Sequence, residues 1–159
     1  MGAQGSNGSP EPERMQRLSD TENQSYVLDE QVGYLLRLVS QRHTVIFQSL
    51  VPEDLTPTQF STILRAAERG EVSQNQLGRL AAMDVATIKG VVDRLRAKGL
   101  IDSRPDPRDK RRSLVFLTAT AQSLIPALKE AGAGISAKTL SPLSEAERKQ
   151  LILLLRKLI

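Results

Sequence analysis

The sequence predicts a mainly helical protein that carries one small β-hairpin. Along most of the chain, apolar residues recur at helical spacing, and the runs begin at serine, threonine or aspartate residues suited to capping a helix. The exception is the stretch 100–117, in which two short strand-like runs flank a turn with two prolines and two aspartates. Aromatic residues make up only 3% of the chain, so Leu, Val, Ile and Ala must fill the core, which suits a helical protein.

The composition indicates a tail followed by one ordered domain. Residues 1–22 are rich in Gly, Ser, Pro, Glu and Gln and lack periodicity, so we expect them to be disordered. Residues 23–159 have the length of one domain with a dimerisation extension. The sequence contains no cysteine and a single histidine, so we expect no disulfide, no metal site and no other cofactor.

We expect a cytoplasmic protein that has no membrane partner. No run of 18 apolar residues is present, and such a run is what a membrane-spanning helix requires. The N-terminus also lacks the charged and apolar regions of a signal peptide.

A long amphipathic helix is expected over residues 25–50. Its apolar residues share one face, and they are Leu28, Val32, Leu35, Leu36, Val39, Ile46, Phe47 and Leu50. At about 1.5 Å per residue the helix is roughly 35–40 Å long. A helix of this length extends beyond the small lobe that follows, so part of its apolar face must meet another surface, most simply a second subunit.

Residues 56–118 predict three short helices followed by the hairpin. The helices begin at capping boxes formed by Thr56 with Gln59 and by Ser73 with Gln76, and at an aspartate cap, Asp84. Only residues 82–83 link the second helix to the third, as in a helix-turn-helix. The third helix, which ends at Gly99, is then the helix that reads a DNA groove, and the hairpin after it is a wing.

Positive charge is concentrated in this part of the chain. Residues 86–112 carry nine bases and four acids, a net charge of +5, whereas residues 1–30 carry a net charge of −4. A concentrated basic segment is typical of a protein that binds the phosphate backbone. The alternative is a solvated helix face, and the helix-turn-helix arrangement favours nucleic acid over it.

Two further helices are expected within residues 119–159. Thr118 or Thr120 caps the first of them, and Pro126 predicts a kink or local break inside it. Ser144 and Glu147 form a capping box that opens the last helix, which is strongly apolar. We expect this terminal helix to dock against the first helix and its mate from another chain, so the segments 25–50 and 119–159 are predicted to be dimerisation helices.

His43 lies on the first predicted helix, near apolar residues. A lone histidine in that position is more often a satisfied core or interface residue than a ligand contact. The alternative is a small-ligand pocket in which Tyr34, Arg37, His43 and Phe47 take part, with Arg42 close by. A hydroxyl and cations beside apolar residues suit an organic anion such as an aromatic carboxylate.

Residues 26–158 resemble the MarR family of transcriptional regulators. The resemblance rests on five motifs: LTPTQF at 55–60, QLGRL at 76–80, VVDRLRAKGLI at 91–101, RPDPRDKRR at 104–112, and Leu117-Thr118. The segments 41–44 (QRHT) and 83–90 (MDVATIKG) are also similar to the branch that controls nicotinate or hydroxynicotinate catabolism. Gly90 departs from the usual family pattern, and close approach to DNA or to another helix is the expected reason.

The resemblance implies a winged helix-turn-helix homodimer that binds a pseudo-palindromic operator. Members of the family typically repress transcription, and a small phenolic or aromatic acid often releases them. With the charge pattern, this predicts contacts to base edges by Ala86, Thr87 and Lys89, to phosphates by Ser73, Gln74, Asn75 and Arg94, and from the wing by Arg108, Lys110, Arg111 and Arg112. Asp109 is expected to brace the wing by pairing with Arg94 or Arg111.

Two other kinds of function remain open on the sequence. One is a constitutive DNA-binding protein that senses no ligand, and the other is a winged-helix module for protein contacts. We expect no enzymatic activity, because the sequence offers one histidine, no cysteine and no nucleophile–base arrangement.

Overall fold

A computed structural model of the chain describes residues 26–109 and 111–159. The predicted tail, residues 1–22, lies outside these residues, as does Lys110. The described residues fall into two units, 26–37 and 38–159, which are considered separately. No helix within the described ranges is long and apolar enough to cross a membrane.

The first unit contains a 3-10 turn and the start of a helix. The turn η1 spans Leu28–Glu30, and α2 begins only at Val32 and ends at Leu50. Between them Gln31 has an extended backbone, and its amide donates to the Leu28 carbonyl at 3.0 Å. The prediction of one helix over 25–50 was therefore wrong at its start. With 19 residues α2 is about 28 Å long, shorter than expected.

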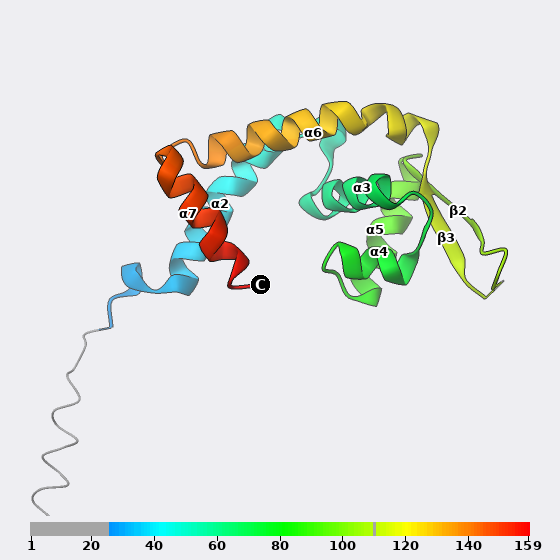
Figure 1. Ribbon diagram of the computed structural model, residues 1–159, viewed down its shortest axis with the longest axis horizontal. Helices are drawn as coiled ribbons and strands as arrows, with labels where there is room; N and C mark the ends of the chain where they lie inside the picture. Colours follow the sequence, from blue (N-terminus) through cyan, green and yellow to red (C-terminus); the bar gives the residue numbers. More distant parts are fainter. Residues whose placement is uncertain (1–25, 110) are drawn as a thin grey trace, which may run out of the picture. The chain divides into compact units, whose positions relative to one another are not determined.

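The second unit carries three short helices and a small sheet. Their bounds are α3 Pro57–Arg69, β1 Val72–Ser73, α4 Gln74–Leu80, α5 Val85–Ala97, β2 Ile101–Pro105 and β3 Ser113–Leu117. The sheet is antiparallel in the order β1-β3-β2, with Val72 opposite Val115 and Ser103 also opposite Val115. Figure 1 shows β2 and β3 as a hairpin that follows α5. Strand β1 was not predicted.

The helices begin where the sequence places their caps. Thr56 and Gln59 form the complete capping box of α3. At α4 the Ser73 hydroxyl accepts from the Gln76 amide at 3.3 Å, but the return bond from the Gln76 side chain is not formed within the described residues. Ser73 is also the last residue of β1, so its backbone is held by the sheet rather than by Gln76.

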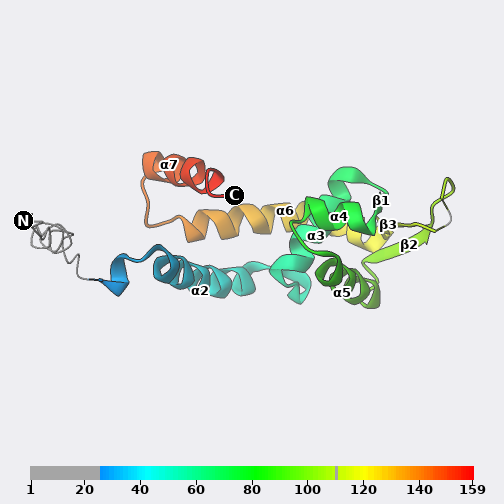
Figure 2. The same cartoon turned by 90° about the horizontal axis from the view of Figure 1, so that it is seen from below.

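The apolar face of α5 supplies much of the core. Ile88, Val91, Val92 and Leu95 are 0–1% exposed. They pack in one cluster with residues from the neighbouring elements, among them Ile63, Leu77, Leu100, Ile101 and Val115. Figure 2 shows α3, α4 and α5 gathered at the base of the sheet. Burial of this face leaves the opposite face of α5 in solvent.

Two helices complete the second unit. Helix α6 spans Ala119–Thr139 and is capped by Thr118, and α7 spans Glu145–Arg156 behind the complete capping box at Ser144. The predicted break at Pro126 was wrong, because α6 runs through it without interruption. Ala121 and Leu128, which flank the proline, are fully buried, and this packing on both sides holds the segment helical.

Glycine is required where α5 ends. Gly99 has a φ of +70°, and its amide donates to the Arg96 carbonyl while the Leu100 amide donates to the Leu95 carbonyl. These two bonds define a Schellman motif, which accepts a residue in the left-handed region most readily when that residue is glycine. Ala82, in the turn between α4 and α5, has a φ of +53° without being glycine.

We expect Gly99→Ala and Ala82→Gly to change stability in opposite directions. The first places a Cβ in the left-handed region and should lower the free energy of unfolding by about 1–2 kcal/mol. The second removes such a Cβ and should raise it by up to about 1 kcal/mol, part of the gain being offset by unfolded-state entropy. Urea denaturation followed by circular dichroism measures both. Stability changes of the same sign would contradict the left-handed backbone conformation as their cause, because both positions are exposed and neither change alters core packing.

Candidate nucleic-acid interface

The start of α5 is fixed by its aspartate cap. The Asp84 Oδ1 atom accepts from the Thr87 amide at 2.7 Å. The Thr87 backbone N–H, followed by the Thr87 hydroxyl, lowers the pKa of Asp84 below its usual 3.8, so the carboxylate is ionised at neutral pH. A negative charge at a helix N-terminus interacts favourably with the helix dipole. The first turn, which contains Ala86 and Thr87, is therefore held in place.

The residues predicted to read bases lie on the exposed face of α5. Ala86, Thr87 and Lys89 are all exposed, whereas Ile88 between them is buried. A Cβ added to Gly90 would meet only the Arg94 guanidinium, at 3.6 Å or more. The nearest neighbours of that Cβ thus belong to α5 itself rather than to another helix, and the alternative reason for Gly90, close approach to DNA, stays a prediction.

Lys89 is already paired within the helix. Its Nζ atom lies 3.0 Å from Oδ2 of Asp93, and Nη1 of Arg96 lies 3.1 Å from Oδ1 of the same carboxylate. Arg96 also donates to the Ser103 hydroxyl of β2 at 2.9 Å. The sequence interpretation did not assign a role to Asp93 or Arg96. Side chains three and four residues apart on a helix are neighbours, so this spacing could have predicted the two ion pairs.

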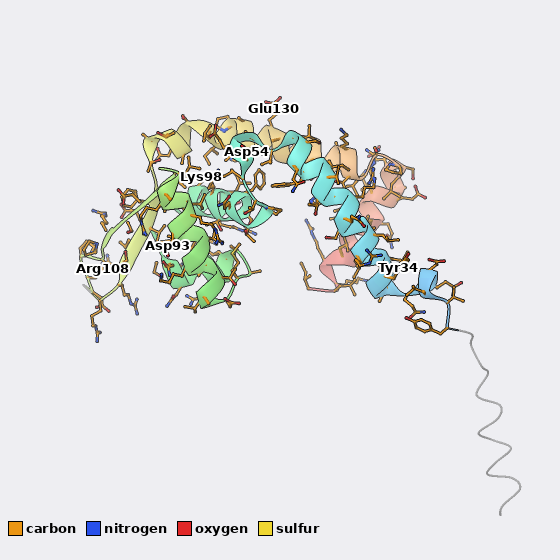
Figure 3. The ribbon with its side chains drawn as sticks, turned by 180° about the vertical axis from the view of Figure 1, so that it is seen from behind. Tyr34, Asp54, Asp93, Lys98, Arg108 and Glu130 are labelled. Atoms are coloured by element: carbon orange, nitrogen blue, oxygen red, sulfur yellow. The ribbon has the colours of Figure 1, made fainter. Side chains whose placement is uncertain are left out.

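The wing is closed by backbone hydrogen bonds and short-range aspartate contacts. The Asp106 amide donates to the Arg112 carbonyl at 2.9 Å, and the Arg112 amide donates to the Asp109 carbonyl at 2.8 Å. Asp106 Oδ1 accepts from the Arg108 amide at 2.8 Å. These bonds shape the turn so that its arginines project outward, and Figure 3 shows Arg108 near the end of the hairpin.

Asp109 pairs with two wing arginines. Its Oδ1 atom lies 3.2 Å from Nε of Arg111, and its Oδ2 atom lies 3.5 Å from Nε of Arg112. The hydrogen bond from the Arg111 side chain, followed by the Arg111 amide, lowers the pKa of Asp109. Of the two expected partners the structure shows Arg111 and not Arg94. Arg111 itself is 92% exposed, so one face of its guanidinium remains free for solvent or a ligand.

Of the remaining predicted phosphate contacts, Arg94 is exposed on α5 and the other three lie at the start of α4. Ser73 is its N-cap, and Gln74 and Asn75 are its first two residues. The Ser73 hydroxyl accepts from the Gln76 amide and retains its own proton for donation. Lys110 lies outside the described residues, so its predicted contact stays a prediction.

The four residues predicted to bind a ligand form two pairs. In the first unit the Arg37 guanidinium lies 5.1 Å from the centre of the Tyr34 ring. In the second unit the His43 and Phe47 rings are 6.4 Å apart, and Phe47 stacks edge-on against Phe60 at 5.6 Å. Each pair joins an aromatic ring to a polar group. Among the described residues no three His, Cys, Asp or Glu side chains gather as a metal site would require.

His43 and Arg42 contact the end of α6. His43 Nδ1 and the Thr139 hydroxyl share a hydrogen bond of 2.9 Å. The Arg42 guanidinium donates to the carbonyls of Thr139 at 2.6 Å and Lys138 at 3.2 Å. A helix leaves its last carbonyls without partners, and a cation there also suits the helix dipole. These contacts join α2 to α6, so His43 has a structural role in this conformation.

Comparison with known proteins shows which proteins the chain is similar to. The chain is 40% identical over 139 residues to the HTH-type transcriptional repressor NicR of Pseudomonas putida, covering 87% of this chain and 88% of NicR. A crystal structure of a probable transcriptional regulator from Pseudomonas aeruginosa matches with a TM-score of 0.81 and 45% identity, covering 84% of this chain and all of that one. The structure of Bordetella bronchiseptica BpsR, a protein whose DNA binding is regulated by 6-hydroxynicotinic acid, matches with a TM-score of 0.78 and 37% identity, covering 84% of this chain and 96% of BpsR.

These matches confirm the predicted winged helix-turn-helix fold and the resemblance on which it was based. The model of the MarR family matches residues 55–113, which include α3, α4, α5 and the first residue of β3. Of these relatives, BpsR is the one described with a nicotinate-type compound, 6-hydroxynicotinic acid. The chain belongs to the MarR family of transcriptional regulators.

Proposed function

We propose that the chain is a transcriptional repressor that binds operator DNA and is released from it by a small aromatic acid. The observation that carries the proposal is the exposed face of α5, held beside a wing whose arginines project into solvent. The match to NicR, named as a repressor, and to BpsR, whose DNA binding is regulated by 6-hydroxynicotinic acid, supports both halves of it. Its site of action is then the cytoplasm, with the DNA.

In this mechanism α5 enters a major groove and the wing follows the backbone. Ala86, Thr87 and Lys89 face base edges, while Ser73, Gln74, Asn75 and Arg94 contact phosphates. Arg108, Lys110, Arg111 and Arg112 provide the wing contact, and Asp109 braces Arg111 and Arg112. A dimer presents two such helices to successive grooves about 34 Å apart, which is why the operator would be pseudo-palindromic.

We expect Arg111→Ala to weaken binding to any DNA sequence and to lower the dependence on salt. Loss of one phosphate contact should reduce the slope of log affinity against log salt by about 1. Fluorescence anisotropy with a fragment of the chain's own promoter region measures the slope. Lys129→Ala, which removes an exposed cation of α6, is the matched control and should leave the slope unchanged. An unaltered slope for Arg111→Ala would remove the wing from the proposed interface.

The exposed apolar surface supports a homodimer. In α7 and the residues after it, Leu153 is 55%, Leu154 46% and Leu158 71% exposed, although all three are large and apolar. In the part of α2 that belongs to the second unit, Val39 and Val45 are also more than half exposed. Patches of this kind on a soluble protein mark interaction surfaces. A second copy of the chain is the proposed partner, because α2 and α7 both expose large apolar side chains.

We expect Leu154→Lys to convert the dimer to a monomer and to abolish tight operator binding. The change buries a charge in the proposed interface, whereas the core of the DNA-binding lobe does not include Leu154. Sedimentation velocity measures the mass, and circular dichroism checks that the fold persists. Lys149→Gln, on the same helix, is the control. A wild-type protein that already sediments as a monomer would contradict the proposal.

The ligand is proposed to act near His43. His43, whose ring lies 6.4 Å from the buried Phe47 ring, and Arg42, which contacts the same end of α6, offer an aromatic carboxylate both polar and apolar contacts. These same groups hold the end of α6. A ligand that binds one spacing of the two reading helices better than another shifts the population toward that spacing, and only this differential affinity can release the DNA.

We expect 6-hydroxynicotinic acid to release the wild-type protein from its operator, and His43→Ala to require at least about tenfold more ligand. Thr139→Val is the matched control, because it removes the hydrogen-bond partner of His43 but leaves the imidazole in place. If both variants respond alike, His43 acts only through α6. If no aromatic acid releases the wild type, the chain is a constitutive DNA-binding protein.

A winged-helix module for protein contacts is the remaining alternative, and an enzyme is not proposed. The charge of the wing region favours nucleic acid over a protein partner. Failure to bind DNA from its own promoter region would favour the protein-interaction module.

A further inference from the structure

A carboxylate lies in the middle of the face that is proposed to enter the DNA groove. Asp93 projects from α5 opposite the buried residues, and Figure 3 shows it on the outer side of that helix. DNA carries one negative charge per phosphate, so a carboxylate on this surface opposes DNA binding. Its presence there therefore needs another explanation. The contacts of Asp93 indicate what that purpose is.

Asp93 holds two cations of the same helix, one on each oxygen. Lys89 contacts Oδ2 at 3.0 Å, and Arg96 contacts Oδ1 at 3.1 Å. The hydrogen bond from Lys89, with charge attraction from both cations, keeps the pKa of Asp93 below its usual value, so the group is ionised at neutral pH. Arg96 continues the network to the hydroxyl of Ser103 on β2. One carboxylate thus orders cations along α5 and connects them to the first strand of the wing.

Helix stability does not explain this arrangement. All three side chains are 42–68% exposed, and exposed ion pairs contribute little to folding. Lys89 also precedes Asp93 by four residues, and this order is the less favourable one for a pair on a helix. The network therefore contributes little to folding, and its charges act mainly on the DNA that this face is proposed to bind.

We propose that Asp93 is a positioning residue that determines how well the protein distinguishes its operator from other DNA. By holding Lys89 and Arg96 and adding a negative charge between them, it withholds these cations from phosphates of any sequence. Binding without sequence preference comes almost entirely from cation–phosphate contacts, so this binding is the one that Asp93 weakens. The base contacts proposed for Ala86 and Thr87 are not held by Asp93 and are not withheld. Lys89, the third proposed base contact, leaves Asp93 only where the operator offers a base edge that accepts its ammonium. The inference rests on the proposed DNA binding.

The test is Asp93→Asn, which keeps the shape of the side chain and removes its charge. Affinities for the operator fragment and for an unrelated duplex of equal length are measured over a salt series. Binding to the unrelated duplex is expected to tighten by about tenfold, and its salt slope to steepen by about 1–2, as two cations become available. The operator gains less, so the ratio of the two affinities falls. Asp93→Glu, which keeps the carboxylate, is expected to preserve the ratio.

Glu68→Gln is the matched control. Glu68 pairs with Arg65 on the exposed side of α3 at 2.8 Å, so this variant also frees one arginine and removes one negative charge. It should leave the ratio unchanged. Melting temperatures of all variants check that no effect arises from stability.

Three results would overturn the proposal. A loss of operator affinity in Asp93→Asn with unchanged binding to the unrelated duplex would make Asp93 a base contact instead. Equal tightening of binding to both duplexes would mean that Asp93 acts only through net charge. Unchanged affinity for both would mean that the network does not lie at the DNA interface. If the wild type shows no salt-dependent DNA binding at all, the proposed function itself fails, and this outcome is separate from the other three.

Discussion

The burial of one face of α5 is the interaction on which the rest of the structure depends. Ile88, Val92 and Leu95 are completely enclosed, and each fully buried side chain of this size contributes about 1.5–3 kcal/mol relative to an exposed one. Because a helix repeats every 3.6 residues, enclosing these positions determines which residues must face outward. The cations, the small residues and Asp93 thus share the outer face as a consequence of core packing.

Signals that act over a few residues were readable in the sequence, and those that depend on distant partners were not. The caps at Thr56, Asp84 and Ser144 and the glycine end at Gly99 involve neighbours within five residues. Strand β1 is only two residues long and pairs with residues more than forty positions later, so no local pattern announces it. The unbroken helix at Pro126 has the same cause, because tertiary packing overrides a local preference.

The candidate site shows the same difference between local signals and those that depend on distant partners. The sequence reveals that bases are concentrated in residues 86–112, because charge can be counted without coordinates. It does not reveal how those bases are paired. The partners of Asp109 are set by the turn that the wing adopts, which brings Arg111 and Arg112 to its carboxylate and leaves Arg94 on α5. The pairs around Asp93 join helical neighbours, so their spacing could have predicted them, although the sequence analysis did not.

Under the proposed function, helix α6 is the physical route by which a ligand bound near His43 acts on the DNA-binding surface. At one end its carbonyls accept hydrogen bonds from Arg42, and toward the other end Ala121 and Leu128 are enclosed in the same cluster as the core of α5. A helix is stiff along its axis, so a displacement at Thr139 is carried along it rather than absorbed locally. A ligand that competes for the hydrogen bonds of Arg42 or His43 alters the interaction that fixes this end. The coupling then requires only that the two positions of α6 differ in how well they bind the ligand.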